Sequence, residues 1–329
     1  MRRLLAVQAQ DLHAARRALR ARTRRLTAVD VDRALTDERS IVMAWLGRGT
    51  LHMVSREDYP WMLALTAPRQ ATDSDRRLAQ EGISGADAER ALRAIEEALS
   101  DAGPLTRPEL AARVAAHGIR TEGQAMPHLL RRAALRGTAV LGPIRGARQA
   151  FALTRDWLDA EPATGLAGAE RDSALAELGR RYLAGHGPAT AGDLAYWAGL
   201  PLRDARAGLE AIAGELAELD DGLVELAAGG ATPRRIAPRL LPAFDAYMLG
   251  WKDRRFAVPA EQIPRVYSGG MVSPAATADG RMVGTWRAAR RGRRLALEIE
   301  PFEELPSGVE DGLRGEAGDV ARFEGLELA

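Results

Sequence analysis

Two glutamines near the start of the chain, Gln8 and Gln10, have a type and spacing that would let them act as a pair. In a helix, side chains two residues apart point about 200° from each other, whereas in an extended strand they share a face. Asp11 follows directly and is a favourable helix N-cap, with apolar residues at helical spacing behind it. We therefore expect an extended segment that leads into a helix at about 12–22, with both amides on one side. The alternative is a pair of solvated glutamines in a loop.

Other kinds of active-site chemistry have little support in the sequence. The chain has no cysteine, which excludes disulfides and thiolate chemistry, and its five histidines show no metal-ligand spacing. No catalytic triad and no glycine-rich phosphate loop is visible. We therefore expect no metal and no cofactor. No apolar run approaches the ~20 residues of a membrane span, so we expect a cytoplasmic, nucleoid-associated protein with no membrane partner.

The charges are strongly separated along the chain, although the net charge is only +1. Residues 1–25 hold eight arginines and one acid, and residues 281–294 hold six arginines and no acid. From Glu298 to the end, ten acids stand against two arginines. This separation predicts basic surfaces that bind a polyanion, together with an acidic tail. The alternative is an ordinary ion-paired surface.

A capping-box pattern recurs along the chain and indicates repeated units. A threonine stands three residues ahead of an acid in three places: Thr27–Asp30, Thr106–Glu109 and Thr190–Asp193. Around the last two, "GPLTRPELAARVA" and "GPATAGDLAYWAG" align without gaps, 84 residues apart. The period exceeds that of solenoid repeats, so the pattern indicates duplication of a domain.

The second unit is the clearest, and it follows the winged-helix plan, which usually binds nucleic acid. We expect its helices at about 87–100, at 107–116 and from Thr121, with Gln124 as another capping partner, and its hairpin strands at 138–142 and 150–154. In the first unit we expect helices at 28–35 and 38–47, a strand at 50–54 and a helix after it. In the third unit we expect helices at 173–185, 191–198 and 202–213 and a degenerate strand.

Beyond residue 234 the pattern changes to short strands and glycine-rich turns, and the Asp-Gly of "TADGRMVGTW" predicts a hairpin. The expected fold class is α+β, with tandem winged-helix (helix-turn-helix) units followed by a small C-terminal β domain, a partial barrel. The expected domains are 1–85, 86–160, 170–233 and 234–329, the last with the acidic tail.

Several stretches, taken in order, resemble the AlkZ/YcaQ family of winged-helix DNA glycosylases: "VQAQD", "RGTLHMV" with "DYPWMLAL", "LLPAFDAYMLGWKDR" and "GRMVGTW". The resemblance covers nearly the whole chain. Gln8-Ala9-Gln10 matches the Gln–aliphatic–Gln form of AlkZ-like members, which implies that Gln8 and Gln10 are catalytic. Two features depart from the family pattern. Only seven residues precede Gln8, where the family has further helical sequence, and Leu12 replaces an expected proline.

The resemblance implies a monofunctional DNA glycosylase that removes N-alkylated purines (cationic N7 or N3 adducts) from double-stranded DNA, including unhooking of interstrand crosslinks. A cationic purine leaves without a general acid, so the protein needs only to place a water beneath C1′ of the sugar. Amide oxygens can accept from that water and orient it. We expect a monomer. The alternatives are a non-catalytic winged-helix DNA-binding protein, such as a regulator, and an inactive truncated paralogue.

Further residues are candidates for DNA contact or for lining the pocket. Arg48, Thr50 and His52 alternate along one strand, Arg145 and Arg148 lie on the expected wing, and Arg287, Arg290 and Arg291 lie in the C-terminal basic run. Asp245 and Tyr247 alternate and could line a pocket beside Gln8. The alternatives are a hydrogen-bonded, half-buried role for His52, solvated surface charge for each arginine, and a buried structural hydrogen bond for Asp245 and Tyr247.

Overall fold

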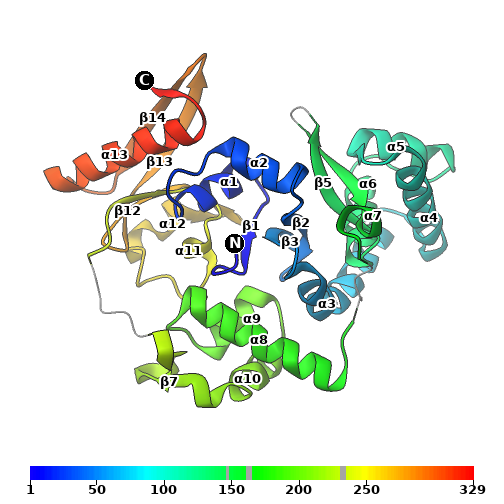
Figure 1. Ribbon diagram of the computed structural model, residues 1–329, viewed down its shortest axis with the longest axis horizontal. Helices are drawn as coiled ribbons and strands as arrows, with labels where there is room; N and C mark the ends of the chain where they lie inside the picture. Colours follow the sequence, from blue (N-terminus) through cyan, green and yellow to red (C-terminus); the bar gives the residue numbers. More distant parts are fainter. Residues whose placement is uncertain (146–147, 161–164, 230–234) are drawn as a thin grey trace.

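A six-stranded sheet forms the centre of the N-terminal half of the protein (Figure 1). The computed structural model describes residues 1–145, 148–160, 165–229 and 235–329. The strand order is β1-β3-β2-β5-β6-β4, and the bounds are β1 (Ala6–Gln8), β2 (Ile41–Leu46), β3 (Thr50–Ser55), β4 (Leu105–Thr106), β5 (Ala139–Arg145) and β6 (Arg148–Leu153). Because β2 pairs with β5 through Met43 and Leu141, the first two predicted units share one sheet.

Helices cover both faces of this sheet. One face, with Val7, Met43 and Met53, packs in a core with helices α1 (Leu12–Arg20), α2 (Ala28–Thr36), α4 (Gly85–Ala102), α5 (Arg107–Ala116) and α6 (Ala125–Leu135). The other face, with Ala44 and Val54, packs with helices α3 (Tyr59–Gln80), α7 (Thr154–Leu158), α8 (Gly168–His186), α9 (Ala191–Ala198) and α10 (Leu202–Glu210). The alternation of side chains along each strand therefore divides the part of the protein built on this sheet into two cores. A small hairpin of β7 (Leu216–Glu218) and β8 (Val224–Leu226) follows α10.

The C-terminal part is built on an open five-stranded sheet in the order β15-β14-β13-β12-β9. Its strands are β9 (Arg239–Leu241), β12 (Ala275–Ala278), β13 (Arg281–Arg291), β14 (Arg294–Pro301) and β15 (Glu327–Leu328). Short elements cover one face: α11 (Ala246–Leu249), α12 (Ile263–Val266), β10 (Tyr267–Ser268) and β11 (Met271–Val272). The predicted Asp-Gly turn joins β12 to β13, with positive φ angles at both Asp279 and Gly280.

The predicted acidic tail is instead largely a helix, α13 (Ser307–Phe323). Its apolar side, with Leu313 and Val320, packs against Trp286 and Leu295 of the sheet. Apolar residues at helical spacing therefore determine the structure of this segment more than its acidic composition does.

Acids of the α13 region pair with the basic N-terminal helix, so much of the predicted basic surface there is internal to the fold. Arg20 is buried, and its guanidinium lies 3.1 Å from both Glu316 and Asp319. Arg17 lies 2.8 Å from Glu324. Figure 1 shows α1 and α13, from opposite ends of the chain, on neighbouring parts of the molecule.

The three capping boxes predicted at helix N-termini are confirmed. Thr27, Thr106 and Thr190 each form a capping box with the acid three residues on. Gln124 is not the capping partner of Thr121, because it is itself the N-cap residue of α6.

The predicted helix at 38–47 is wrong, because residues 41–46 form strand β2. Its six residues are all apolar, and they pair along their full length with β3. A short apolar run of this kind fits a buried strand as well as a helix, and only pairing decides between them.

The mixture of helices and sheets confirms the α+β class. The division into tandem winged-helix units and its boundaries stay predictions. In the described ranges, no helix is long and apolar enough to cross a membrane.

Candidate active site

Gln8 lies in strand β1, as the predicted extended segment requires, whereas Gln10 lies two residues beyond the end of that strand, in a bend. Gln8 is the last residue of β1 and faces His52 of β3, and the Ala9 N–H continues the pairing by donating to the Leu51 carbonyl at 2.7 Å. Asp11 then caps α1 by accepting from the backbone N–H of His13 at 2.8 Å. The chain therefore changes from strand to helix directly after the two amides. Gln8 is half-buried and Gln10 is exposed.

A cavity of about 350 Å³ opens beside Gln8. Its walls come from three parts of the chain that lie far apart in sequence: the β2–β3 turn, helix α9 and the C-terminal part. The lining includes Gln8, Arg48, Thr50, Tyr196, Phe244, Leu249, Arg254 and Tyr267, together with the β10–β11 turn from Ser268 to Met271. Among these lining residues there is no carboxylate, so any acid or base chemistry here must use amides, hydroxyls or water.

Arg48 connects Gln8 to the aromatic wall of the cavity. One guanidinium nitrogen donates to Gln8 Oε1 at 3.2 Å, and the guanidinium carbon lies 4.8 Å from the centre of the Tyr196 ring. Burial lowers the pKa of Arg48 from its usual value. The hydrogen bond from Arg48 therefore holds the Gln8 amide in a fixed orientation. Arg48 is itself held by its cation–π contact with Tyr196.

Tyr196, Arg254 and Tyr267 complete the wall, and sequence reasoning did not identify them. Arg254 donates to the Tyr196 hydroxyl at 2.8 Å and lies 4.3 Å from the centre of the Tyr267 ring. The Tyr267 hydroxyl donates to the Met248 carbonyl at 2.9 Å, and burial raises the pKa of Tyr267 to about 12. No spacing pattern relates these three residues, because they meet only through tertiary packing.

The turn that carries Arg48 packs against a glycine at the end of α9. Gly199 has a φ of +67°, and a Cβ there would lie 2.8 Å from Arg48 Cα and 2.9 Å from Arg48 N. We expect Gly199→Ala to lower the free energy of unfolding by about 3 kcal/mol, because it combines a left-handed alanine with a backbone clash. Urea unfolding measures this.

Gly192→Ala on the same helix is the matched control, since a Cβ there meets only the Thr190 hydroxyl at 3.4 Å. It should leave stability unchanged or slightly raised. Equal effects of the two substitutions would contradict the packing argument.

The candidate DNA contacts on β3 separate into two kinds. Thr50 lines the cavity, and its buried hydroxyl has no hydrogen-bond partner among the described residues. His52 is buried beneath the turn and does not line the cavity; its Nδ1 donates to the Thr50 carbonyl at 2.9 Å. This geometry agrees with the structural alternative for His52.

Two buried histidines, His52 and His186, predict acid sensitivity. Burial lowers the pKa of each to about 4, against about 6.5 in an unfolded chain. Between these values only the unfolded state binds the protons, so stability is fully present above pH 6.5 and is lost as the pH falls towards 4. We expect each histidine to cost about 2 kcal/mol of stability by pH 5 relative to pH 7. Urea unfolding at several pH values measures the slope.

His186→Phe tests this directly, because His186 stacks on Tyr182 at 4.9 Å between ring centres and its ring nitrogens have no hydrogen-bond partner in the described structure. The variant should flatten the slope between pH 7 and 5 whatever its absolute stability. An unchanged slope would show that other groups control the acid response.

Asp245 and Tyr247 are not among the residues that line the cavity beside Gln8. Asp245 is fully buried and accepts from Arg22 at 2.7 Å. The Tyr247 hydroxyl donates to the Gly280 carbonyl at 2.5 Å. Asp245 therefore has the buried hydrogen-bonding role that was the alternative to pocket lining, and Tyr247 makes a hydrogen bond from a partly buried position.

The other candidate arginines lie away from the cavity, on exposed hairpins. Arg145 and Arg148 are exposed at facing ends of β5 and β6, and the two residues between them fall outside the described ranges. Arg287 pairs with Glu298 at 2.8 Å. Arg290 and Arg291 are exposed near the tip of the β13–β14 hairpin, which projects from the body of the protein in Figure 1.

No group of three or more His, Cys, Asp or Glu side chains in the described structure could hold a metal ion.

Comparisons with known proteins identify the family. The family model for DNA glycosylase AlkZ-like proteins matches residues 1–323. An interstrand DNA cross-link repair glycosylase of Streptomyces sahachiroi is 28% identical over 350 residues, covering 98% of this chain and 90% of that protein. The solved structure of Streptomyces sahachiroi DNA glycosylase AlkZ superposes with a TM-score of 0.76 and 26% identity, covering 100% of this chain and 91% of that one. The chain therefore belongs to the AlkZ-like DNA glycosylase family, as the resemblance in the sequence predicted.

Proposed function

We propose that this protein is a monofunctional DNA glycosylase that hydrolyses the N-glycosidic bond of N-alkylated, cationic purines in double-stranded DNA. The observation that carries the proposal is the Gln8 amide, fixed by Arg48 at the edge of a cavity of about 350 Å³. The cross-link repair named for the Streptomyces sahachiroi relative supports extending the substrates to interstrand crosslinks.

The absence of a carboxylate among the cavity-lining residues fits this substrate class. An N7- or N3-alkylated purine carries a positive charge, so it leaves as a neutral base when the bond to C1′ breaks and the electron pair moves to nitrogen. Water then forms the new bond to C1′ and releases its proton to solvent. The protein needs to orient that water and stabilise the positive sugar, which the amide oxygen of Gln8 at the cavity can do. Gln10 does not line the cavity and its Oε1 accepts from the Leu51 N–H, so it is proposed as the second amide on the strength of the family motif.

The arginines fit contacts to the DNA backbone better than contacts to a cationic base. Arg48 and Arg254 lie against aromatic rings at the cavity wall, where they can bind the phosphates that flank the lesion. Thr50 supplies an unpartnered hydroxyl at the same wall. We propose more distant phosphate contacts at five exposed arginines: Arg145, Arg148, Arg287, Arg290 and Arg291. For Arg287 this contact requires that its ion pair with Glu298 breaks first.

The test is a single-turnover incubation with duplex DNA that contains one N7-methylguanine, followed by alkaline cleavage at the abasic site. Wild-type protein should excise the base, and the Gln8→Ala/Gln10→Ala double variant should not. A parallel reaction with a crosslinked duplex tests unhooking. If folded wild-type protein binds the duplex but excises nothing, the protein is a non-catalytic DNA-binding member of its family.

A further inference from the structure

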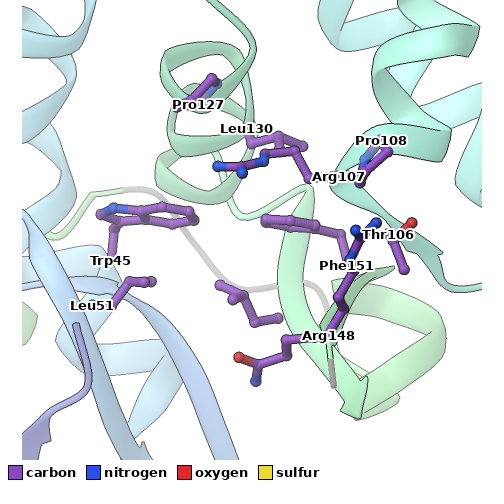
Figure 2. A pocket seen from close by; sticks show the side chains of 11 residues that line it. Trp45, Leu51, Thr106, Arg107, Pro108, Pro127, Leu130, Arg148 and Phe151 are labelled. Carbon is purple, nitrogen blue, oxygen red and sulfur yellow. The ribbon is translucent and has the colours of Figure 1, made fainter. Parts of the chain in front are cut away.

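A second cavity, of about 410 Å³, lies at the junction of the first two predicted units (Figure 2). Its volume falls within the range of sites that hold small organic ligands. It is lined by residues of β2, β3, β6, α5 and α6, including Trp45, Leu51, Leu130 and Phe151. None of these four residues has a role in the proposed reaction.

Two aromatic rings line this cavity. Trp45 of β2 and Phe151 of β6 are nearly parallel, with ring centres 6.3 Å apart and 11° between the planes. Figure 2 shows the two rings side by side, both seen nearly edge-on. Trp45 is only half-buried, so part of its ring faces the cavity. Flat surfaces of this kind favour a planar ring by stacking.

Two exposed arginines, Arg107 and Arg148, also line the cavity. Neither has an acidic partner in the described parts of the chain, whereas Arg17, Arg20 and Arg287 all do. The cavity therefore combines an aromatic surface with two uncompensated positive charges. The complementary ligand is a planar ring that carries an anionic group.

Strand β3 contributes to both this second cavity and the cavity beside Gln8. Thr50 lines the cavity beside Gln8, and the next residue, Leu51, lines the second one. The Leu51 N–H also donates to Gln10 Oε1 at 3.3 Å. A DNA strand held at the glutamines can therefore reach both cavities with nucleotides close together in the duplex.

We propose that the second cavity binds one unpaired nucleotide of the DNA, with its base stacked on Trp45 and its phosphate held by Arg107 and Arg148. This rests on the proposed action on DNA but not on the catalytic step. The occupant is part of the nucleic acid, because the charge and the aromatic surface together match a nucleotide and the site adjoins the glutamines.

The test compares two labelled duplexes of the same sequence, one fully paired and one with a single bulged 2-aminopurine nucleotide. Wild-type protein should bind the bulged duplex about tenfold more tightly, which corresponds to about 1.4 kcal/mol, and should quench the 2-aminopurine fluorescence by stacking. Trp45→Leu keeps an apolar side chain but removes the ring. It should lose both the preference and the quenching, with the affinity for the paired duplex unchanged.

Arg107→Gln/Arg148→Gln provides a second variant at exposed positions where folding is not at risk. It should weaken binding of the bulged duplex about tenfold more than binding of the paired duplex, because the phosphate contact proposed above for Arg148 is lost equally from both duplexes. Arg113→Gln, exposed on the same helix α5, is the matched control and should behave as wild type. The proposal fails if wild-type protein shows no preference for the bulge, or if both cavity variants retain it.

N7-methylguanine excision is measured on the same preparations to separate the two proposals. Bulge preference without excision would overturn only the catalytic proposal. Excision without bulge preference would overturn only the nucleotide site.

Discussion

Gln8→Ala lowers the single-turnover rate of N7-methylguanine excision about 100-fold, with little change in the affinity for the damaged duplex. The expected size follows from the loss of a fixed group that positions the attacking water, which is typically worth about 100-fold or more. Affinity is preserved because Arg48, which donates to Gln8, remains stacked on Tyr196. Rapid-quench measurement of the abasic product and fluorescence anisotropy of the duplex give the two quantities.

Gln80→Ala is the matched control for this prediction. Gln80 is an exposed glutamine at the end of α3 and accepts only from Arg77, at 3.1 Å. Its loss should leave both the rate and the affinity at wild-type values. A Gln8→Ala protein that excises as fast as wild type would remove Gln8 from the mechanism and leave Gln10 to be tested alone.

Arg20→Ala has a large expected effect on stability. Its guanidinium donates to Glu316, Asp319 and the Leu240 carbonyl, the last at 2.8 Å, from an almost fully buried position. Removing it leaves the Leu240 carbonyl without this donor and leaves the poorly exposed Glu316 carboxylate with only Arg239 and the Leu240 N–H among its described partners, so we expect the free energy of unfolding to fall by about 3 kcal/mol. Urea unfolding followed by circular dichroism measures the change.

Arg24→Ala, at an exposed arginine near the same helix, should change stability by less than about 0.5 kcal/mol. Loss of stability in both variants would point to the net charge of the N-terminal region rather than to the buried contact. A double-mutant cycle with Glu316→Gln isolates the pairwise part of the effect.

Features encoded by neighbouring residues could be predicted from the sequence. The capping box at Thr106 and the Asp279–Gly280 turn depend on side chains and φ angles within four residues, so the pattern alone determines them. The extended backbone at Gln8 followed from the N-cap at Asp11 for the same reason. The catalytic role of Gln8 and Gln10 was predicted from the family resemblance, because their geometry alone does not distinguish them from the other glutamines.

Features that depend on long-range pairing could not be predicted. The run at 41–46 becomes a strand because β3 and β5 are available on either side of it, and neither partner is visible in the run itself. The wall formed by Tyr196, Arg254 and Tyr267 joins helix α9 to the C-terminal part. Sequence patterning places such residues on their elements but does not show which elements meet.

The arginine-rich beginning of the chain shows that the location of a charged surface also depends on long-range contacts. Composition predicts a polyanion surface, yet Arg17 and Arg20 are paired within the fold with acids near the other end. Other arginines, such as Arg148 and Arg291 on hairpins, are exposed and remain available for DNA. Charge counts therefore indicated the class of partner but placed part of its surface wrongly.

The pairing of α1 with α13 sets an order of events during protein synthesis. Arg20 and Glu316 are 296 residues apart, so at about 5–20 residues per second the ribosome takes about 15–60 s to supply the partner. During that time Arg20 has no acid from α13, and helix α1 cannot complete its native packing. The nascent chain therefore keeps the helix that follows Gln8 and Gln10 incompletely packed until helix α13 has been made.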